Sequence, residues 1–237
     1  MTELYTPKPA PWRELGALYD ATTLPLFWKD CLTQQIPRGG ERVLVLPGFM
    51  TGDTSTLVLR MTLKTLGHDV HGWGLGLNRG DVWALAARVE QRVRKLASHR
   101  PIHLIGWSLG GVLAREVARR APDDVAQVIT LGTPVVGGPF YTAAAGFYVR
   151  RVPKPEELKA RIEARERVPI RVPVTALYSA RDAVVCPAAC VDAINTHIQH
   201  IPIDCRHAGF GFHSTVFRII ADRLHRPPKP LAPGAPS

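Results

Sequence analysis

The stretch that decides the fold is residues 102–120, which read IHLIGWSLGGVLAREVARR. Residues 102–105 are predicted to form a short buried strand, and residues 109–120 a helix that stops before Pro122. The residues between them fit the pattern G-x-S-x-G, in which a tight strand-to-helix turn raises a serine to the carboxyl edge of a sheet. The helix N-terminus beside this serine favours a developing negative charge. Ser108 is therefore the candidate nucleophile.

Outward from this stretch, predicted strands and helices alternate along the chain, which predicts an α/β fold with a mostly parallel central sheet flanked by helices. The predicted strands cover 43–46, 69–72, 102–105, 125–131, 172–178 and 198–203. The other predicted helices cover 56–66, 81–98 with Asp81 as its cap, and 214–225 with Ser214 as its cap.

One segment, residues 135–171, interrupts the alternation and includes a charged helix predicted at 156–167. We interpret it as a small lid-like insertion over one end of the sheet. The rest of residues 1–225 is predicted to form one α/β domain, because a chain of this length can bury a single core. Residues 226–237 are rich in proline and are predicted to be a disordered tail.

A nucleophilic serine needs a base, and the base needs an acid that orients it. In this architecture the order along the chain is serine, acid, histidine. Asp182 lies in a loop four residues past Tyr178, where such an acid belongs. His207 directly follows the last predicted strand, and His213 lies just before the last helix. A loop that leaves the last strand reaches back over the sheet more naturally, so His207 is the preferred base and His213 a residue beside the site.

The candidate oxyanion hole requires two backbone N–H groups. One comes from Leu109, directly after the serine, and the other from the loop after the first strand, where Gly48 lets the chain turn. Phe49 is preferred for its place directly after the glycine, with Met50 as the alternative.

Aromatic residues in the insertion predict an apolar pocket for an acyl group, although ordinary packing of a short subdomain would explain them as well. The predicted substrate-binding residues are Trp107, Phe140, Tyr141, Phe147, Tyr148, Val184 and His213.

Several stretches together resemble the α/β-hydrolase superfamily, and more closely a bacterial group of lipase- and esterase-like hydrolases. They are VLVLPGFMTGDTST, LGHDVHGWGLGLNRG, HLIGWSLGGVLAREVAR, VITLGTPVVGG, YSARDAVV and RHAGFGFHSTVFRIIADRL. The resemblance implies that Ser108, Asp182 and His207 form the triad, with His213 where relatives usually carry asparagine. It departs from many relatives at Pro47-Gly48, where they have His-Gly, although the backbone donor survives this change.

The expected activity is therefore hydrolysis of carboxylic esters through an acyl-enzyme, on a small molecule with an apolar acyl group and with no cofactor. The same triad could instead serve an acyltransferase, a thioesterase or an amidase. A hydrolase fold that has become a catalytically silent binding protein is the other alternative.

The composition narrows the partners and the compartment. The chain has 30 Lys+Arg against 20 Asp+Glu and a formal charge of +10, but its arginines are spread over several segments without a nucleic-acid motif. We therefore expect a solvated surface and no nucleic-acid partner. No apolar run reaches the roughly 18 residues that a membrane span needs, and the N-terminal residues lack the apolar region of a signal peptide. The sequence therefore predicts a cytoplasmic protein without stable membrane insertion.

The chain has 4 cysteines. Cys186, Cys190 and Cys205 with His207 have an unusual spacing for zinc, so no metal site is predicted. A disulfide from Cys205 to Cys186 or Cys190 is possible, and free buried cysteines are the simpler expectation.

Overall fold

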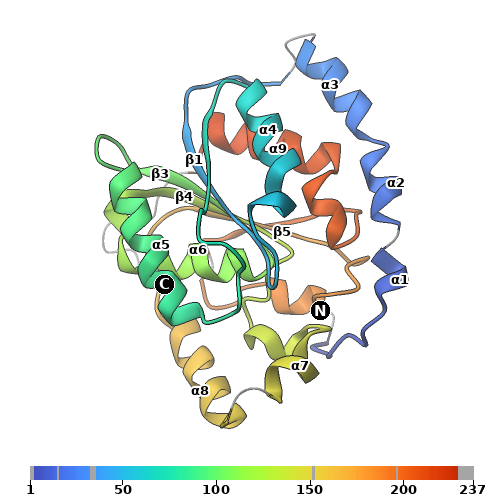
Figure 1. Ribbon diagram of the computed structural model, residues 1–237, viewed down its shortest axis with the longest axis vertical. Helices are drawn as coiled ribbons and strands as arrows, with labels where there is room; N and C mark the ends of the chain where they lie inside the picture. Colours follow the sequence, from blue (N-terminus) through green and yellow to red (C-terminus); the bar gives the residue numbers. More distant parts are fainter. Residues whose placement is uncertain (1–2, 15, 33–35, 151–152, 196, 229–237) are drawn as a thin grey trace.

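The computed structural model describes residues 3–14, 16–32, 36–150, 153–195 and 197–228. At its centre lies a six-stranded sheet in the order β2-β1-β3-β4-β5-β6, and each neighbouring pair is parallel (Figure 1). The predicted α/β class and parallel sheet are thereby confirmed. The strands are β1 (Arg42–Leu46), β2 (Asp69–Gly72), β3 (Ile102–Trp107), β4 (Val125–Leu131), β5 (Val174–Tyr178) and β6 (Gln199–Pro202).

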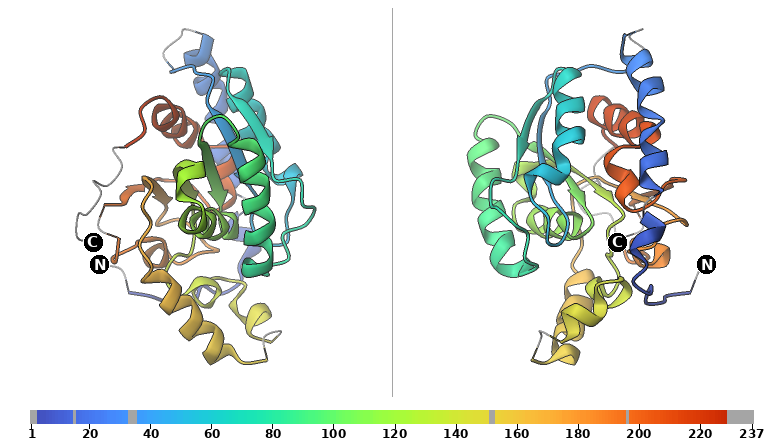
Figure 2. Two further views of the ribbon diagram at one scale, coloured as in Figure 1. Left: turned by 90° about the vertical axis from the view of Figure 1, so that its left-hand side faces the viewer. Right: turned by 45° about the vertical axis from the view of Figure 1, so that its right-hand side comes forward.

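Side chains on the two faces of the sheet pack into two separate hydrophobic clusters, as β1 illustrates. Val43 and Val45 pack into one buried cluster, whereas Leu44 and Leu46 pack into the other. A strand buried on both sides needs apolar residues at successive positions, which explains the run VLVL. The first cluster is covered by α3 (Leu24–Leu32), α4 (Leu57–Thr65) and α9 (Ser214–His225), and the second by α5 (Val82–Leu96) and α6 (Leu109–Arg120) (Figure 2).

Two segments outside these layers lie close to the candidate site. The insertion contains η3 (Gly138–Tyr141), α7 (Ala145–Val149) and α8 (Pro155–Glu166), and α7 and α8 sit together at one end of the molecule (Figure 1). The N-terminal helices α1 (Pro11–Glu14) and α2 (Ala17–Ala21) follow one side of the molecule toward α3 (Figure 1). The remaining short helices are η1 (Asp53–Thr56), η2 (Pro122–Asp124), η4 (Pro187–Cys190) and η5 (Ala208–Gly211).

The predicted boundaries lie within two residues of the observed ones, and three of the differences from the prediction have a local cause. The helix expected from residue 56 begins as the 3₁₀ turn η1, and β5 starts at Val174, directly after a proline that has no N–H to donate. His213, rather than Ser214, caps α9, because its Nδ1 accepts the Thr215 N–H at 3.2 Å. Of the predicted tail, residues 229–237 lie outside the described residues.

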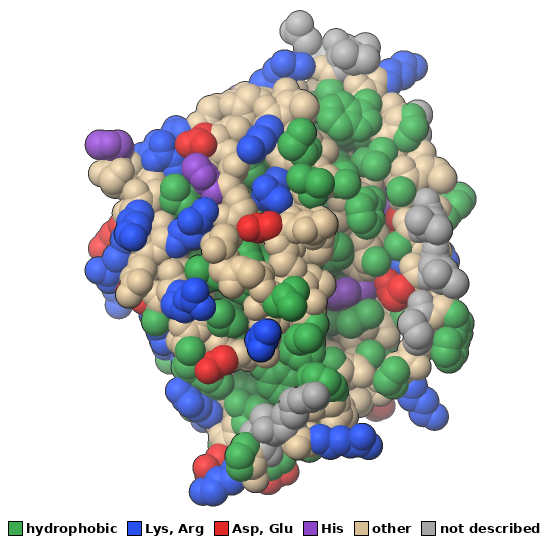
Figure 3. All heavy atoms as spheres, viewed as in Figure 1, with side chains coloured by type: hydrophobic (Ala, Val, Ile, Leu, Met, Phe, Trp, Pro, Cys, Tyr) green, Lys and Arg blue, Asp and Glu red, His purple; other side chains and the backbone are tan. Residues whose placement is uncertain are grey.

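On the face seen in Figure 1, the basic residues do not form one continuous patch. Figure 3 shows Lys and Arg side chains scattered among apolar and acidic ones on the face seen in Figure 1. None of the described helices is both long and apolar enough to cross a membrane.

Candidate active site

The turn from β3 to α6 holds Ser108 in a strained backbone conformation. Its φ is 54° and its ψ −122°, a region that residues with a side chain rarely adopt. The Ser108 N–H donates to the Leu131 carbonyl at 2.8 Å, and the Gly111 N–H donates to the Ser108 carbonyl at 2.9 Å. These bonds tie the strained residue to β4 on one side and to α6 on the other.

Two glycines make this turn possible because backbone crowds against them. A Cβ on Gly106 would lie 2.3 Å from the Gly111 Cα, and one on Gly110 would lie 2.2 Å from the Leu46 carbonyl oxygen. Both distances are far inside van der Waals contact. The motif therefore needs glycine at these two positions so that α6 can pack directly on β3 and β1.

Two backbone amides beside Ser108 have no acceptor among the described residues, namely those of Phe49 and Leu109. The Met50 amide differs, because it donates to the Asn78 carbonyl at 2.7 Å. Met50 is thus unavailable as the second oxyanion donor, and of the two predicted alternatives only Phe49 keeps a free N–H.

Asn78 holds the loop that carries Phe49, a role that the sequence did not reveal. This buried side chain donates from Nδ2 to the Pro47 carbonyl at 2.9 Å, and its backbone N–H donates to Thr51. Together with the bond from Met50, these contacts fix both ends of the short turn 47–51. An asparagine in a glycine-rich loop is common, so no sequence pattern marks it.

Asp182 and His207 form a buried pair. His207 Nδ1 lies 2.7 Å from Asp182 Oδ2, while Asp182 Oδ1 accepts the N–H groups of Val184 and Val185 at 2.8 and 2.7 Å. Burial lowers the pKa of His207, but the charge and hydrogen bond of Asp182, with a smaller contribution from Glu14, outweigh it, so that the His207 pKa is raised overall. This carboxylate therefore orients the imidazole and favours its protonated form.

Ser108 and His207 line the same cavity, which has a volume of about 400 Å³. No hydrogen bond joins their side chains within the described part of the chain, so the serine–base contact is open in this structure. Such contacts are often long before substrate binds. Trp107 helps to hold the backbone of His207 in place, because its Nε1 donates to the His207 carbonyl at 3.2 Å.

Several of the residues predicted for substrate binding or for the oxyanion hole line this cavity, and others do not. Phe49, Trp107, Leu109, Tyr148 and Val184 line it. The residues that do not are Met50, Phe140, Tyr141, Phe147 and His213.

The physical reasons for these five corrections are local. Phe147 is 42% exposed and packs edge-on against Phe49, at 5.7 Å between ring centres, outside the cavity. Tyr141 packs over Gly137, and the Phe140 carbonyl accepts the Thr6 hydroxyl at 2.9 Å. His213 is engaged as the cap of α9, and the Met50 side chain is half exposed.

The insertion contributes lining residues that the sequence analysis missed. Leu158 and Ile162 of α8 both line the cavity, one helical turn apart on the same face. Tyr148 of α7 joins the insertion to the loop after β2, because its hydroxyl donates to the Gly80 carbonyl. Burial and the charge of Asp81 raise the pKa of Tyr148 to about 12, so this hydroxyl stays protonated. The spacing of Leu158 and Ile162 could have indicated a buried stripe on α8.

The cavity wall farther along α6 and α8 is charged. Arg115, Glu116, Arg119, Arg165 and Glu166 all line it. Arg115 pairs with Asp192, and Glu116 pairs with Arg165. Burial raises the pKa of Glu166 to about 7, and burial with the neighbouring arginines lowers the pKa of Arg119 to about 10. The apolar space therefore runs from Ser108 toward a polar wall.

All four cysteines are free and buried, so the disulfide considered for Cys205 does not form here. Among the described residues, no group of three or more His, Cys, Asp or Glu side chains is arranged to hold a metal ion.

Comparison with known proteins adds independent evidence on the fold. Residues 60–154 match the sequence model of a family described as "alpha/beta hydrolase fold". This region includes the turn that carries Ser108 and three strands of the parallel sheet, β2, β3 and β4. The chain has the α/β-hydrolase fold.

Solved structures agree with this assignment of the fold. The chain superposes with a TM-score of 0.60 on a structure reported for LipS and LipT, two metagenome-derived lipolytic enzymes. The sequence identity is 16%, and the match covers 81% of this chain and 96% of that one. A second structure, an α/β hydrolase enzyme from the sediment metagenome of the Mar Chica lagoon, Morocco, gives a TM-score of 0.57 at 17% identity and covers 80% of this chain and 92% of that one.

Curated relatives of this α/β-hydrolase-fold protein match a shorter region. The chain is 34% identical over 111 residues to the pimeloyl-[acyl-carrier protein] methyl ester esterase of Sodalis glossinidius, which covers 46% of this chain and 40% of that protein. The protein of the same name from Aliivibrio fischeri is 28% identical over 130 residues, covering 53% and 45%. The chain thus spans less than half the length of these relatives.

Proposed function

We propose that this protein hydrolyses carboxylic esters through an acyl-enzyme. The observation that supports it most directly is the single cavity onto which Ser108, the Asp182–His207 pair and the free amides of Phe49 and Leu109 converge. The fold and the names of the curated relatives favour the same class of reaction. The predicted cytoplasmic location is part of this proposal.

In the proposed first step, Ser108 Oγ attacks the ester carbonyl carbon while His207 Nε2 takes the hydroxyl proton. The carbonyl oxygen becomes an oxyanion that the Phe49 and Leu109 N–H groups bind, and one such donor is typically worth about 3–4 kcal/mol. Collapse of this intermediate breaks the bond to the alkoxy oxygen, which receives the proton from His207. Water then repeats the sequence on the acyl-enzyme and releases the acid and free Ser108.

We infer that the acyl group is apolar near the carbonyl, because Trp107, Val112 and Val184 line the space around Ser108. The insertion acts in this proposal as a cover whose residues Leu158 and Ile162 limit the acyl length. Its mobility is a further part of the proposal, since substrate must pass it.

The deciding experiment is labelling of the folded protein with a fluorophosphonate, followed by mass spectrometry of the adduct. Stoichiometric label on Ser108, absent from Ser108→Ala, is the expected result. Ser55→Ala is the matched control, because the Ser55 hydroxyl lies in the same cavity but is bonded to the Gly52 carbonyl at 2.8 Å. A folded protein that takes no label would overturn the proposal and favour the silent binding protein.

The reaction class is tested with matched ester, thioester and amide substrates, with and without a competing alcohol. Fastest turnover of the ester, with water as the main acceptor, is expected. Faster thioester turnover, or predominant transfer to the added alcohol, would replace the ester-hydrolase proposal by one of the alternatives.

The acyl-length proposal is tested with p-nitrophenyl esters of increasing chain length. Leu158→Trp fills the cavity from α8 and is expected to move the preference toward shorter chains. Ala160→Trp, on the exposed side of the same helix, is the control and should leave the preference in place. An unchanged preference in Leu158→Trp would contradict the proposed role of the insertion.

A further inference from the structure

Glu14, the last residue of α1, bridges the two loops that carry the acid and the base. Its Oε1 accepts the Ala183 N–H at 3.2 Å, and its Oε2 accepts the Ala208 N–H at 2.9 Å. Ala183 directly follows Asp182, and Ala208 directly follows His207. One carboxylate thus connects two peptide units, each adjacent to a member of the proposed triad.

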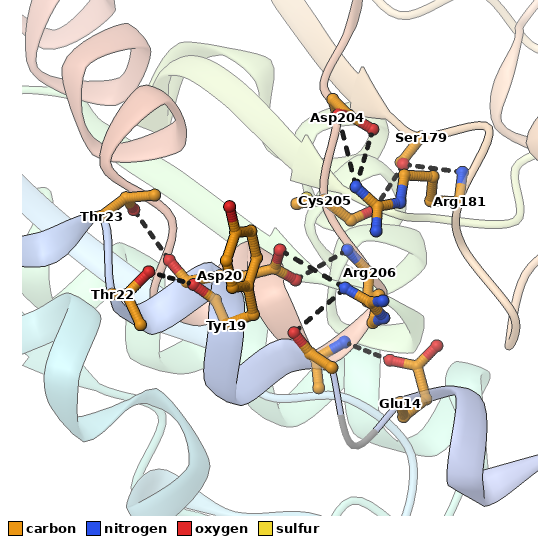
Figure 4. A network of polar contacts seen from close by, with 12 residues as sticks. Glu14, Tyr19, Asp20, Thr22, Thr23, Ser179, Arg181, Asp204, Cys205 and Arg206 are labelled. Atoms are coloured by element: carbon orange, nitrogen blue, oxygen red, sulfur yellow. Dashed lines mark hydrogen bonds and ion pairs between the residues drawn. The ribbon is translucent and has the colours of Figure 1, made fainter.

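A second carboxylate of the N-terminal helices holds the same loop on the other side of His207. Asp20 Oδ2 accepts the Arg206 N–H at 2.9 Å, and the Arg206 guanidinium donates to the Gly16 carbonyl at 3.0 Å. Figure 4 shows Glu14 and Asp20, both from the N-terminal helices, facing the segment that carries Arg206. The loop also fits Asp20 closely, because a Cβ on Gly209 would lie 2.2 Å from Asp20 Oδ2.

The two carboxylates differ in their charge environment. Asp20 is paired with the Arg206 guanidinium, at 3.8 Å between Oδ1 and the nearer nitrogen. Both hydrogen bonds of Glu14 come instead from uncharged backbone amides. The negative charge of Glu14 therefore acts on its surroundings with less compensation than that of Asp20.

The charged groups around His207 can be named element by element. Asp182 approaches from the loop after β5 and Glu14 from α1, and both raise the His207 pKa against the lowering effect of burial. Arg206 is paired with Asp20 of α2, and Arg181 with Asp204 at the exposed edge. Burial raises the pKa of Cys205, which keeps this neighbouring thiol neutral. Trp107 and Phe210 complete the surroundings with uncharged rings.

We propose that Glu14 is a positioning residue of the catalytic pair, which fixes Asp182 and His207 relative to each other and stabilises the histidine in its charged form during the reaction. The proposal rests on the proposed function. Two properties of Glu14 contribute separately. The hydrogen bonds hold the loops in register, and the charge acts on the imidazolium that forms when Ser108 gives up its proton. No pattern around residue 14 announces this role, because the contacts span 169 and 194 residues.

Glu14→Gln removes the charge and keeps one of the two acceptor oxygens, because its amide NH2 takes the place of the other oxygen and faces a backbone N–H. We expect the pH at which kcat/KM is half-maximal on its acid side to fall by roughly half a unit or more, with a loss of kcat of roughly tenfold or less. Glu14→Ala, which removes the bonds as well, should lower kcat further. The opposite result, a Glu14→Gln profile that coincides with the wild-type profile, would overturn the proposal.

Two control variants exclude a general effect of charge or of stability. Asp204→Asn removes an exposed carboxylate three residues before His207 and should leave the acid side of the profile in place. Asp20→Asn should lower Tm through loss of the Arg206 contacts without the shift seen in Glu14→Gln. Equal shifts in all three variants would mean that Glu14 acts only as one more surface charge, and would overturn the proposal.

A measurement that needs no substrate turnover tests the role of Glu14 separately from the proposed ester hydrolysis. The His207 imidazole is titrated by NMR in the wild-type protein and in Glu14→Gln, with Tm recorded for both. A lower His207 pKa in the folded variant supports the positioning role even if no ester is hydrolysed. An unchanged His207 pKa contradicts it even if Ser108 takes the fluorophosphonate label.

Discussion

The two sides of the candidate active site are held by different means. On the nucleophile side, Ser108 and the amides of Phe49 and Leu109 are placed by backbone that packs directly on the sheet. On the acid–base side, Asp182 and His207 sit in loops that side chains of a distant N-terminal segment hold together. The first side depends on close backbone contacts that admit no side chain, whereas the second depends on hydrogen bonds whose donors and acceptors can be exchanged one at a time. Mutations should therefore act in an all-or-none manner on the first side and gradually on the second.

The largest effect is expected for Ser108→Ala, which removes the only proposed nucleophile. We expect kcat/KM to fall by roughly 10⁴- to 10⁶-fold with Tm unchanged within a few degrees. Steady-state kinetics and thermal unfolding measure both quantities, and Ser55→Ala should lose less than tenfold. If Ser108→Ala kept a tenth of the wild-type rate, the contrast between the two sides would have no catalytic meaning.

Gly110→Ala tests the backbone packing of the nucleophile side. The new methyl group would collide with the Leu46 carbonyl, so the free energy of unfolding should fall by about 3 kcal/mol or more. Gly146→Ala in α7 is the control, because a Cβ there meets nothing within 4 Å, and its effect should stay below about 1 kcal/mol. Equal stabilities in urea unfolding would show that the turn has more freedom than the structure indicates.

The pH profile of the wild-type protein tests the acid–base side. His207 must be neutral to take the Ser108 proton, and its pKa is raised by Asp182 and Glu14. The kcat/KM should therefore begin to fall at a pH above the ordinary histidine value of about 6.5, and then drop about tenfold for each further unit of acidity. An acid side centred below the ordinary value would mean that burial, which lowers the pKa, dominates the site.

The smallest effect is expected for Met50→Gly. Met50 shares its φ of 54° with Ser108, and these two are the non-glycine residues with positive φ among the described ones. The relief of this strain opposes the greater freedom that glycine gives the unfolded chain, so the free energy of unfolding should change by less than about 1 kcal/mol. The activity should change little, because the Asn78 bond uses the Met50 backbone. A large activity loss would return Met50 to the candidate oxyanion donors.

The contrast also explains which features the sequence could predict. The parallel sheet and the Ser108 turn follow from local patterns, since short apolar runs, glycines and helix caps determine them within a few residues. Asp182 and His207 could be selected because each lies in the loop after a predicted strand. The prediction failed where an outcome depended on which backbone group finds a partner across the fold, as with Met50 and the carbonyl of Asn78.

The insertion shows the same limit in its aromatic residues. Their hydrophobicity indicates burial somewhere, but the direction of Phe140, Tyr141 and Phe147 depends on how η3 and α7 turn against the sheet. Leu158 and Ile162 reach the cavity because α8 lies along it. The four-residue spacing of Leu158 and Ile162 indicates a common face of α8, but it does not indicate which surface that face meets.

The N-terminal segment contacts both the insertion and the loop that carries the proposed base. The Thr6 hydroxyl holds the Phe140 carbonyl at the start of the insertion, and the same stretch of chain continues to Glu14 at the loop of His207. A movement of the insertion that carries Phe140 outward must either break the Thr6 bond or pull on this stretch. Residues 6–14 thus contact both the insertion and the loop that carries His207, so one short segment of the chain is shared by the two.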